Sequence, residues 1–330
     1  MSVLVIVIII IALSFDFLNG MNDAANSIAT VVSTKVLTPT QGVAWAAFWN
    51  FAAVFIFGVH VAKTIGKGIV EADVINEYVV LAALIGAIAW VFTCTRFGLP
   101  ISVSHSLIGG LIGPALLIGG TSVLISSGII KVALFIFLSP IIGFFLGYLI
   151  MVGTMWIFRK RSPRKVDGIF RVMQLLSSAV FSLGHGSNDA QKTIGIITIL
   201  LFSTGFLQGE FHVPTWVIFA SYLTIGAGTL AGGWKVIKTL GTSLTHLKPV
   251  QGFCAETAGA LTVIGSTLGG IPVSTTHTIT GSIMGVGSVK RLSAVRWGVA
   301  GNIVLAWVLT IPATVIMSGG AYLIIRLIVK

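Results

Sequence analysis

The chain has 330 residues, of which 55% are hydrophobic and 9% are charged, and its mean hydropathy is +1.03. A soluble protein of this length could not hide so much apolar surface. The net charge of +11 could suggest a nucleic-acid partner, but the basic residues are distributed as membrane sidedness requires. Apolar runs of about 20 residues predict helical spans, because lipid tolerates only helices and closed barrels. We therefore predict an all-α polytopic membrane protein.

Ten apolar segments follow one another along the chain. They lie near 2–33, 40–61, 78–95, 99–120, 122–157, 173–205, 213–232, 250–268, 271–288 and 297–325. No Lys or Arg precedes Lys35, which argues for a retained first span rather than a cleavable signal peptide. The first and sixth segments are long enough to contain a break.

The strongest basic cluster runs from Arg159 to Lys165, and Arg171 follows it. Such a cluster is expected on the cytoplasmic side of the cell membrane. It divides the chain into a first repeat, 1–158, a basic linker, 159–171, and a second repeat, 172–330.

The remaining charges agree with a single topology. Alternation outward from the linker places Lys35, Arg96, Lys235, Lys238, Lys248, Lys290, Arg291 and Arg296 inside, and Lys63, Lys67, Lys131, Arg326, Lys330, Glu71, Asp73, Glu77 and Glu210 outside. Five segments in each half give the halves opposite orientations and put both termini outside. This is the inverted-repeat arrangement of many secondary transporters. Re-entrant hairpins at 78–120 and 250–288 keep the same parity, and we expect them together with broken helices.

Two motifs occur once in each half and in the same order. Residues 20–24, Gly-Met-Asn-Asp-Ala, match 186–190, Gly-Ser-Asn-Asp-Ala, at an offset of 166. Residues 98–106, Gly-Leu-Pro-Ile-Ser-Val-Ser-His-Ser, match 270–278, Gly-Ile-Pro-Val-Ser-Thr-Thr-His-Thr, at an offset of 172. This order indicates internal duplication.

The Pro-Ser motif predicts a helix start inside the membrane. Gly-x-Pro ends one helix, proline suits the first turn of the next, and Ser or Thr caps it. The free N–H groups and the positive end of the helix dipole then form an anion site. The hydroxyl donors are Ser102, Ser104, Ser274, Thr275 and Thr276. Two such starts from opposed halves would make a cradle for a small tetrahedral oxyanion, although an ordinary helix kink is the simpler alternative.

The Asn-Asp motif predicts a cation site. Hard oxygen ligands are available from Asn22, Asp23, Asn26, Asn188 and Asp189. We expect breaks at Gly20 and Gly186 to free backbone carbonyls, a ligand set that suits Na⁺. Alternatively, Asp189 could be a structural partner of Lys192. Asp16 and Glu256 are further intramembrane acids, and they could be ion ligands, proton acceptors or gating groups.

At these residues the chain resembles the inorganic phosphate transporter (PiT) family. The resemblance covers both halves and rests on 16–30, 184–195, 252–256 and 270–278. It implies symport of inorganic phosphate with Na⁺ as the coupling ion, by alternating access, without a cofactor and without enzymatic chemistry. It also assigns Gln191, Lys192 and Thr193 to the extended second signature, beside phosphate, and Glu256 to a family acid. The first-half counterpart of Glu256 is an acid in many relatives, whereas this chain has Asn50 in the similar stretch, which leaves a paired-glutamate mechanism open.

Other functions remain open at the level of sequence. A proton-coupled phosphate or sulfate permease would use Asp16 and Glu256 as proton carriers. An anion channel would use the same helix starts, but buried acids in both halves fit ion coupling better. Assembly as a homodimer is a further expectation.

Overall fold

The computed structural model describes residues 2–59, 61–62, 68–209, 212–271 and 273–329. Within these ranges it contains helices and no strand, which confirms the all-α prediction. The first half contains α1 (Val3–Ser33), α2 (Pro39–Ala52), α4 (Glu77–Phe97), α5 (Val103–Gly119) and α6 (Ser126–Phe158). The second half contains α7 (Pro163–Ser203), α8 (Thr215–Ala231), α9 (Trp234–Lys238), α10 (Pro249–Leu268), α11 (Thr275–Ser288) and α12 (Trp297–Ile328). The predicted outside charges Lys63, Lys67, Glu210 and Lys330, and Pro272 of the second Pro-Ser motif, lie outside the described residues.

Six helices of the described chain are long and apolar enough to cross a membrane, namely α1, α4, α5, α6, α7 and α12. A seventh candidate consists of α8 and the segment Trp234–Ser243, which are bent by 66° relative to one another. The expected segment 40–61 does not form one long helix, because α2 ends at Ala52 and is only about 21 Å long. After α2, the side chain of Gln191 accepts from the N–H of Val61 and donates to the carbonyl of Gly58. These bonds satisfy backbone groups that have no helical partner, so the segment can remain irregular.

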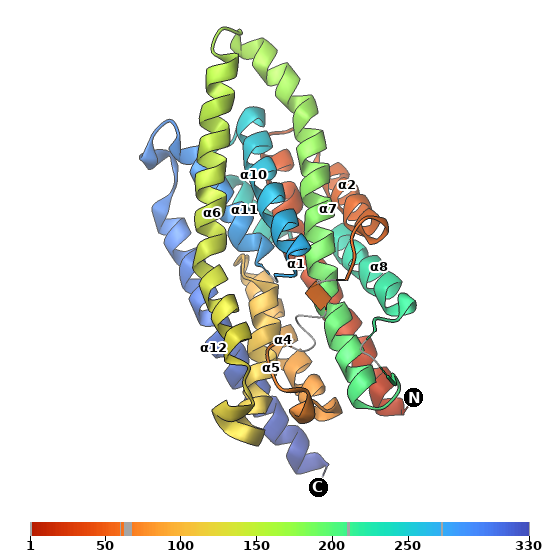
Figure 1. Cartoon of the computed structure of the whole chain (residues 1–330). Helices are drawn as coiled ribbons and strands as arrows, with labels where there is room; N and C mark the ends of the chain where they lie inside the picture. The colour runs from red at the N-terminus through yellow and green to blue at the C-terminus, as the bar shows by residue number, and fades with distance from the viewer. Residues whose placement is uncertain (1, 60, 63–67, 210–211, 272, 330) are drawn as a thin grey trace.

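Two hairpins enter the molecule from opposite ends. Figure 1 shows α4 and α5 near the end of the molecule that holds both chain termini. It shows α10 and α11 near the opposite end, which holds the α6–α7 connection. The long helices α6 and α7 run from one end of the molecule to the other (Figure 1). This arrangement fits two re-entrant hairpins, because the starts of α5 and α11 come together, with the rings of His105 and His277 in contact.

The two halves exchange packing partners in a matched way. Helix α5 packs against α12, α11 packs against α6, α1 packs against α8, and α7 packs against α2. A Cβ atom at Gly109 or Gly113 would collide with the backbone of α12, and one at Gly281 or Gly285 would collide with the backbone of α6. Small residues allow such close approach between membrane helices. The same device at matched positions fits an inverted duplication.

The predicted breaks at Gly20 and Gly186 are wrong, because α1 and α7 continue through both glycines as α-helix. The reason lies in packing. A Cβ at Gly20 would strike the carbonyl of Ile225 on α8, and one at Gly186 would strike the backbone of Asn50 on α2. The glycines therefore permit helix contact. The breaks occur instead between α4 and α5, between α10 and α11, and between α8 and α9.

Candidate functional site

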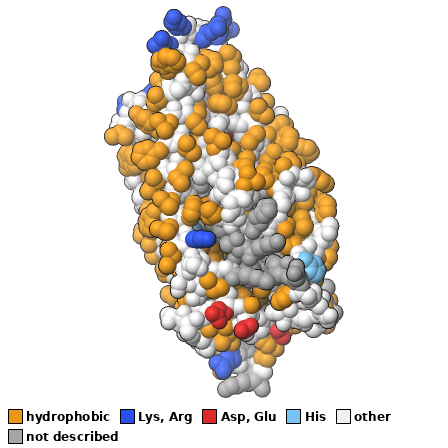
Figure 2. Space-filling model, in the orientation of Figure 1, with side chains coloured by type: hydrophobic (Ala, Val, Ile, Leu, Met, Phe, Trp, Pro, Cys, Tyr) orange, Lys and Arg blue, Asp and Glu red, His pale blue; other side chains and the backbone are white. Residues whose placement is uncertain are grey.

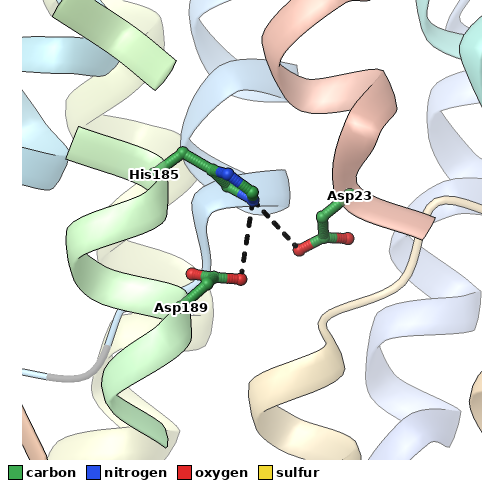
Figure 3. Close-up of side chains that lie close together, drawn as sticks. All are labelled: Asp23, His185 and Asp189. Atoms are coloured by element: carbon green, nitrogen blue, oxygen red, sulfur yellow. Dashed lines mark ion pairs between the residues drawn. The ribbon is translucent and has the colours of Figure 1, made fainter. Parts of the chain in front are cut away.

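Three titratable side chains meet where α1 passes α7. His185 Nε2 lies 3.9 Å from Asp23 Oδ2 and 3.7 Å from Asp189 Oδ2 (Figure 3). Their ligand atoms all lie within 4.8 Å of one another, and each side chain is buried. Two carboxylates and an imidazole at this separation can share one cation.

A chain of hydrogen bonds determines which ring nitrogen of His185 carries the hydrogen when the ring is neutral. The hydroxyl of Thr229 donates to the carbonyl of Ile225 at 2.9 Å, so it accepts from Asn50 Nδ2 at 3.0 Å. Asn50 Oδ1 therefore faces His185 Nδ1, at 3.1 Å, and this nitrogen must be the donor. In the neutral ring, Nε2 then presents a lone pair to both carboxylates. A cation or a proton between them would remove the resulting repulsion.

The start of α11 meets α1 at the same place. The hydroxyls of Thr275 and Thr276 donate to the carboxylate of Asp23 at 3.4 and 3.3 Å. They accept from Asn26 Nδ2 at 3.3 and 3.0 Å. The predicted cation ligands of the first half and the predicted anion donors of the second half are therefore direct neighbours.

The paired asparagines have equivalent environments. Asn22 Nδ2 donates to Thr95 Oγ1 at 2.7 Å, and Asn188 Nδ2 donates to Thr267 Oγ1 at 2.9 Å. These bonds turn the amide oxygens away from the threonines. Among the described residues, the Oδ1 atoms of Asn22, Asn26 and Asn188 have no hydrogen-bond partner. Buried oxygens without partners are the ligands that a cation site needs.

The two Pro-Ser motifs form matched helix starts. Ser102 caps α5 by accepting from the N–H of His105 at 3.3 Å, and Ser274 caps α11 by accepting from the N–H of His277 at 3.2 Å. The rings of the two histidines pack edge to face with centroids 4.9 Å apart. Both helix starts therefore converge, as the sequence predicts, and Ser104 is buried with them.

The extension of the second motif has mixed partners. Lys192 Nζ lies 2.7 Å from Asp189 Oδ1, so the structural pairing considered for Asp189 is present. The amide of Gln191 accepts from the N–H groups of Val61 and Ala62 and donates to the carbonyls of Gly58 and Ser187. These bonds leave Gln191 little capacity for another ligand. In the described part of the chain, the hydroxyl of Thr193 has no hydrogen-bond partner.

The two remaining acids lie above and below the cluster. Asp16, Asp23 and Thr30 follow one another at seven-residue intervals on α1, which places them on one face about 10 Å apart. Glu256 accepts from Thr30, Gln174 and Ser177 and is therefore well satisfied. The carboxylate oxygens of Asp16 make no hydrogen bond of normal geometry among the residues described, and only the side chains of Thr193 and Asn19 offer polar groups nearby. Asp16 needs a proton or a cation more than Glu256 does.

Sequence reasoning missed His185 and Asn50 as site residues. His185 lies four residues before Asp189, a spacing that places both on one face of a helix. This spacing was the available signal. Asn50 reaches the site only through the packing of α2 against α7. The sequence marks its stretch only as the place where many relatives carry an acid, and it does not indicate a contact with His185.

Comparison with known proteins identifies the family of the chain. Residues 19–318 match the pattern of a family described as "Phosphate transporter family". The chain belongs to the phosphate transporter family. It is 53% identical over 319 residues to a Rhizobium meliloti protein named "Probable low-affinity inorganic phosphate transporter", covering 97% of this chain and 96% of that protein. A Bacillus subtilis protein of the same name is 42% identical over 328 residues, covering 99% and 98%.

A solved structure described as "The sodium-dependent phosphate transporter" has the same fold. Its TM-score is 0.91 at 27% sequence identity, and the match covers 99% of this chain and 100% of that one. Membership of the phosphate transporter family makes this chain a multi-pass membrane transporter and not an enzyme.

Proposed function

We propose that this phosphate transporter is a Na⁺-coupled symporter that works by alternating access between the repeats 1–158 and 172–330. The observation that carries the proposal is the contact between Asp23 and the two threonines at the start of α11. This contact joins a cation ligand to an anion donor. The description of the solved relative as sodium-dependent supports the choice of Na⁺.

The cation is held by oxygen ligands from both repeats. Asp23 and Asp189 supply carboxylates, and Asn22, Asn26 and Asn188 supply amide oxygens without other partners among the described residues. Hard oxygen ligands suit Na⁺ and other hard cations. Asp189 Oδ2 is also without a hydrogen-bond partner in the described ranges, although its other oxygen binds Lys192.

Phosphate is held at the two helix starts, with Ser102, Ser104, Ser274, Thr275 and Thr276 as donors and Lys192 and Thr193 nearby. A bare Asp23 carboxylate beside these hydroxyls would repel phosphate and compete for their protons. A cation bound to Asp23 removes both effects. Na⁺ and phosphate should therefore raise each other's affinity by the same factor.

All these side chains are buried, none being more than 3% exposed. A substrate can reach such a site only when the hairpins or helices around it move. Alternate opening toward the two ends of the molecule provides that access. Asp16, toward the terminal end, and Glu256, toward the linker end, are placed to act in coupling or gating on the two sides of the site.

A proton-coupled phosphate permease is the second candidate. The buried carboxylate of Asp16 and the lone pair of His185 favour it, because each could accept a proton. Sulfate transport is disfavoured by the family assignment. For membrane placement, we propose the cell membrane, with the linker 159–171 cytoplasmic and both termini outside; pairing as a homodimer stays a prediction.

The deciding experiment is uptake of labelled phosphate into proteoliposomes containing the purified protein. An imposed Na⁺ gradient is compared with an imposed proton gradient, with excess sulfate as competitor. Concentrative uptake under Na⁺ alone, unaffected by sulfate, is expected. Uptake driven only by protons would replace the symporter with the permease, and block by sulfate would overturn the substrate assignment.

A further inference from the structure

A cavity of about 680 Å³ lies at the linker end of the molecule, away from the transport site. Side chains from the end of α6, the connection to α7, the start of α7, the start of α10 and the segment after α11 line it. Its charged lining consists of Arg159, Arg161, Arg164, Lys248, Lys290 and Asp167. Five basic groups and one acid give a formal charge of +4. The cavity is therefore suited to an anion.

The cavity lies at the edge of the apolar surface. On α6 the large exposed apolar side chains continue to Trp156 and Ile157, which are 65% and 68% exposed. On α7 they resume at Ile169 and Val172. Figure 2 shows basic side chains gathered at this end, directly beyond the hydrophobic surface. This is the level at which lipid headgroups meet water, and tryptophan is enriched there.

The lining of the cavity is amphipathic. Beside the basic groups it contains Met151, Met155, Phe158, Val166 and Val250. Inorganic phosphate would gain nothing from this apolar lining, whereas an acyl chain would bury surface against it. The chemistry is that of a phosphate ester attached to a hydrocarbon chain.

The positive charge of the cavity is not neutralised within the protein. The ion pairs present in the described chain involve Asp23, His185, Asp189 and Lys192, and none involves a basic group of the cavity. The N-terminus of α10, at Pro249, adds the positive end of a helix dipole. Arg159 is additionally held over the ring of Trp156, at 5.0 Å from its centroid.

We propose that this cavity binds an anionic phospholipid, with the headgroup phosphate among the basic residues and an acyl chain along the apolar lining. Basic pockets between membrane helices are suited to such headgroups. The lipid would connect the linker between the repeats to α10 and α11, which carry Glu256 and the anion donors. The proposal does not depend on the identity of the coupling ion.

Native mass spectrometry of the full-length protein in detergent tests the proposal, with phosphatidylglycerol and phosphatidylcholine as probes. We expect phosphatidylglycerol to bind at least about tenfold more tightly than phosphatidylcholine. The pocket variant Lys248→Gln/Lys290→Gln, which removes the two lysines of the lining, should lose this preference. The matched control Lys160→Gln/Lys165→Gln removes exposed basic groups of the same linker that do not line the cavity, and it should keep the preference.

A second variant separates the lipid from a free anion. Val166→Trp fills the apolar part of the cavity and retains every charge, so it should weaken phosphatidylglycerol binding. Millimolar inorganic phosphate should not displace the lipid from the wild-type protein. Equal binding of the two lipids, equal loss in the pocket and control variants, unchanged binding by Val166→Trp, or displacement by inorganic phosphate would each overturn the proposal.

Discussion

At the scale of single residues, the buried carboxylates of Asp23 and Asp189 carry the proposed coupling. The change Asp23→Asn or Asp189→Asn keeps the shape of the side chain and removes its charge. We expect at least a tenfold higher Na⁺ requirement for phosphate uptake, equivalent to about 1.4 kcal/mol. Uptake is measured against Na⁺ concentration in proteoliposomes. Asp73→Asn, which alters an exposed acid in the segment before α4, is the control and should behave as wild type.

The anion donors give a separate prediction. Ser104→Ala and Thr276→Ala each remove one hydroxyl from a helix start and leave the charges unchanged. Phosphate should then be required at higher concentration, because a hydrogen bond to a charged group contributes about 1.5–3 kcal/mol. The apparent KM for phosphate is the measurement. Wild-type uptake kinetics in both variants would contradict the placement of phosphate at these helix starts.

Asn50 is predicted to be a positioning residue. The change Asn50→Leu removes the acceptor for His185 Nδ1 and leaves that buried donor unpaired, at a cost of about 1–3 kcal/mol. The ring should lose its fixed orientation toward Asp23 and Asp189. We therefore expect altered Na⁺ dependence of uptake as well as a lower melting temperature. The control Thr93→Val alters an exposed threonine and should leave the Na⁺ dependence unchanged. A lower melting temperature with unaltered Na⁺ dependence would make Asn50 purely structural.

At the scale of helices, glycines determine how closely the halves approach. Gly186 and Gly168 both lie on α7, but a Cβ at Gly186 meets the backbone of Asn50, whereas one at Gly168 meets nothing within 4 Å. Gly186→Ala should destabilise the protein by about 1–3 kcal/mol through overpacking. Gly168→Ala should be neutral or stabilising by about 0.5–1 kcal/mol, because alanine favours helix. Thermal unfolding in detergent distinguishes them, and equal melting temperatures would refute the contact.

At the scale of the whole molecule, the linker and the two termini lie at opposite ends (Figure 1). In a background with Cys94 and Cys254 replaced by alanine, the changes Asp73→Cys and Lys160→Cys report the sidedness. Asp73→Cys, in the exposed segment before α4, should react with an impermeant maleimide in intact cells, and Lys160→Cys only after permeabilisation. The reverse pattern would invert the topology proposed from the positive charges.

The architecture was predictable from local patterns. The Gly-x-Pro-x-Ser motifs predict the starts of α5 and α11, and the structure places their capping serines at these positions. The two matched glycine pairs of α5 and α11, Gly109 with Gly281 and Gly113 with Gly285, fit the same duplication. Hydropathy predicts the long spans, because each span must bury its backbone polar groups within itself wherever it crosses lipid.

The residue pattern within one helix cannot predict which other helix packs against it. The glycines at 20 and 186 read equally well as breaks or as contacts, and only the approach of α8 and α2 decides for contact. Gln191 likewise follows the second signature, yet it binds the irregular backbone after α2. These backbone partners lie more than a hundred residues away in the sequence, so no local periodicity indicates them.

Sequence alone was sufficient for the membrane class, the duplicated motifs and the helix starts, because composition, helix capping and charge act over short stretches of chain. The tertiary structure decided that Asp23 meets Thr275 and Thr276, which lie in the other half of the chain, and that Asn50 orients His185. Such contacts depend on the angle and depth at which whole helices pack. The packing angle and depth are set by many side chains together, so no single motif specifies them.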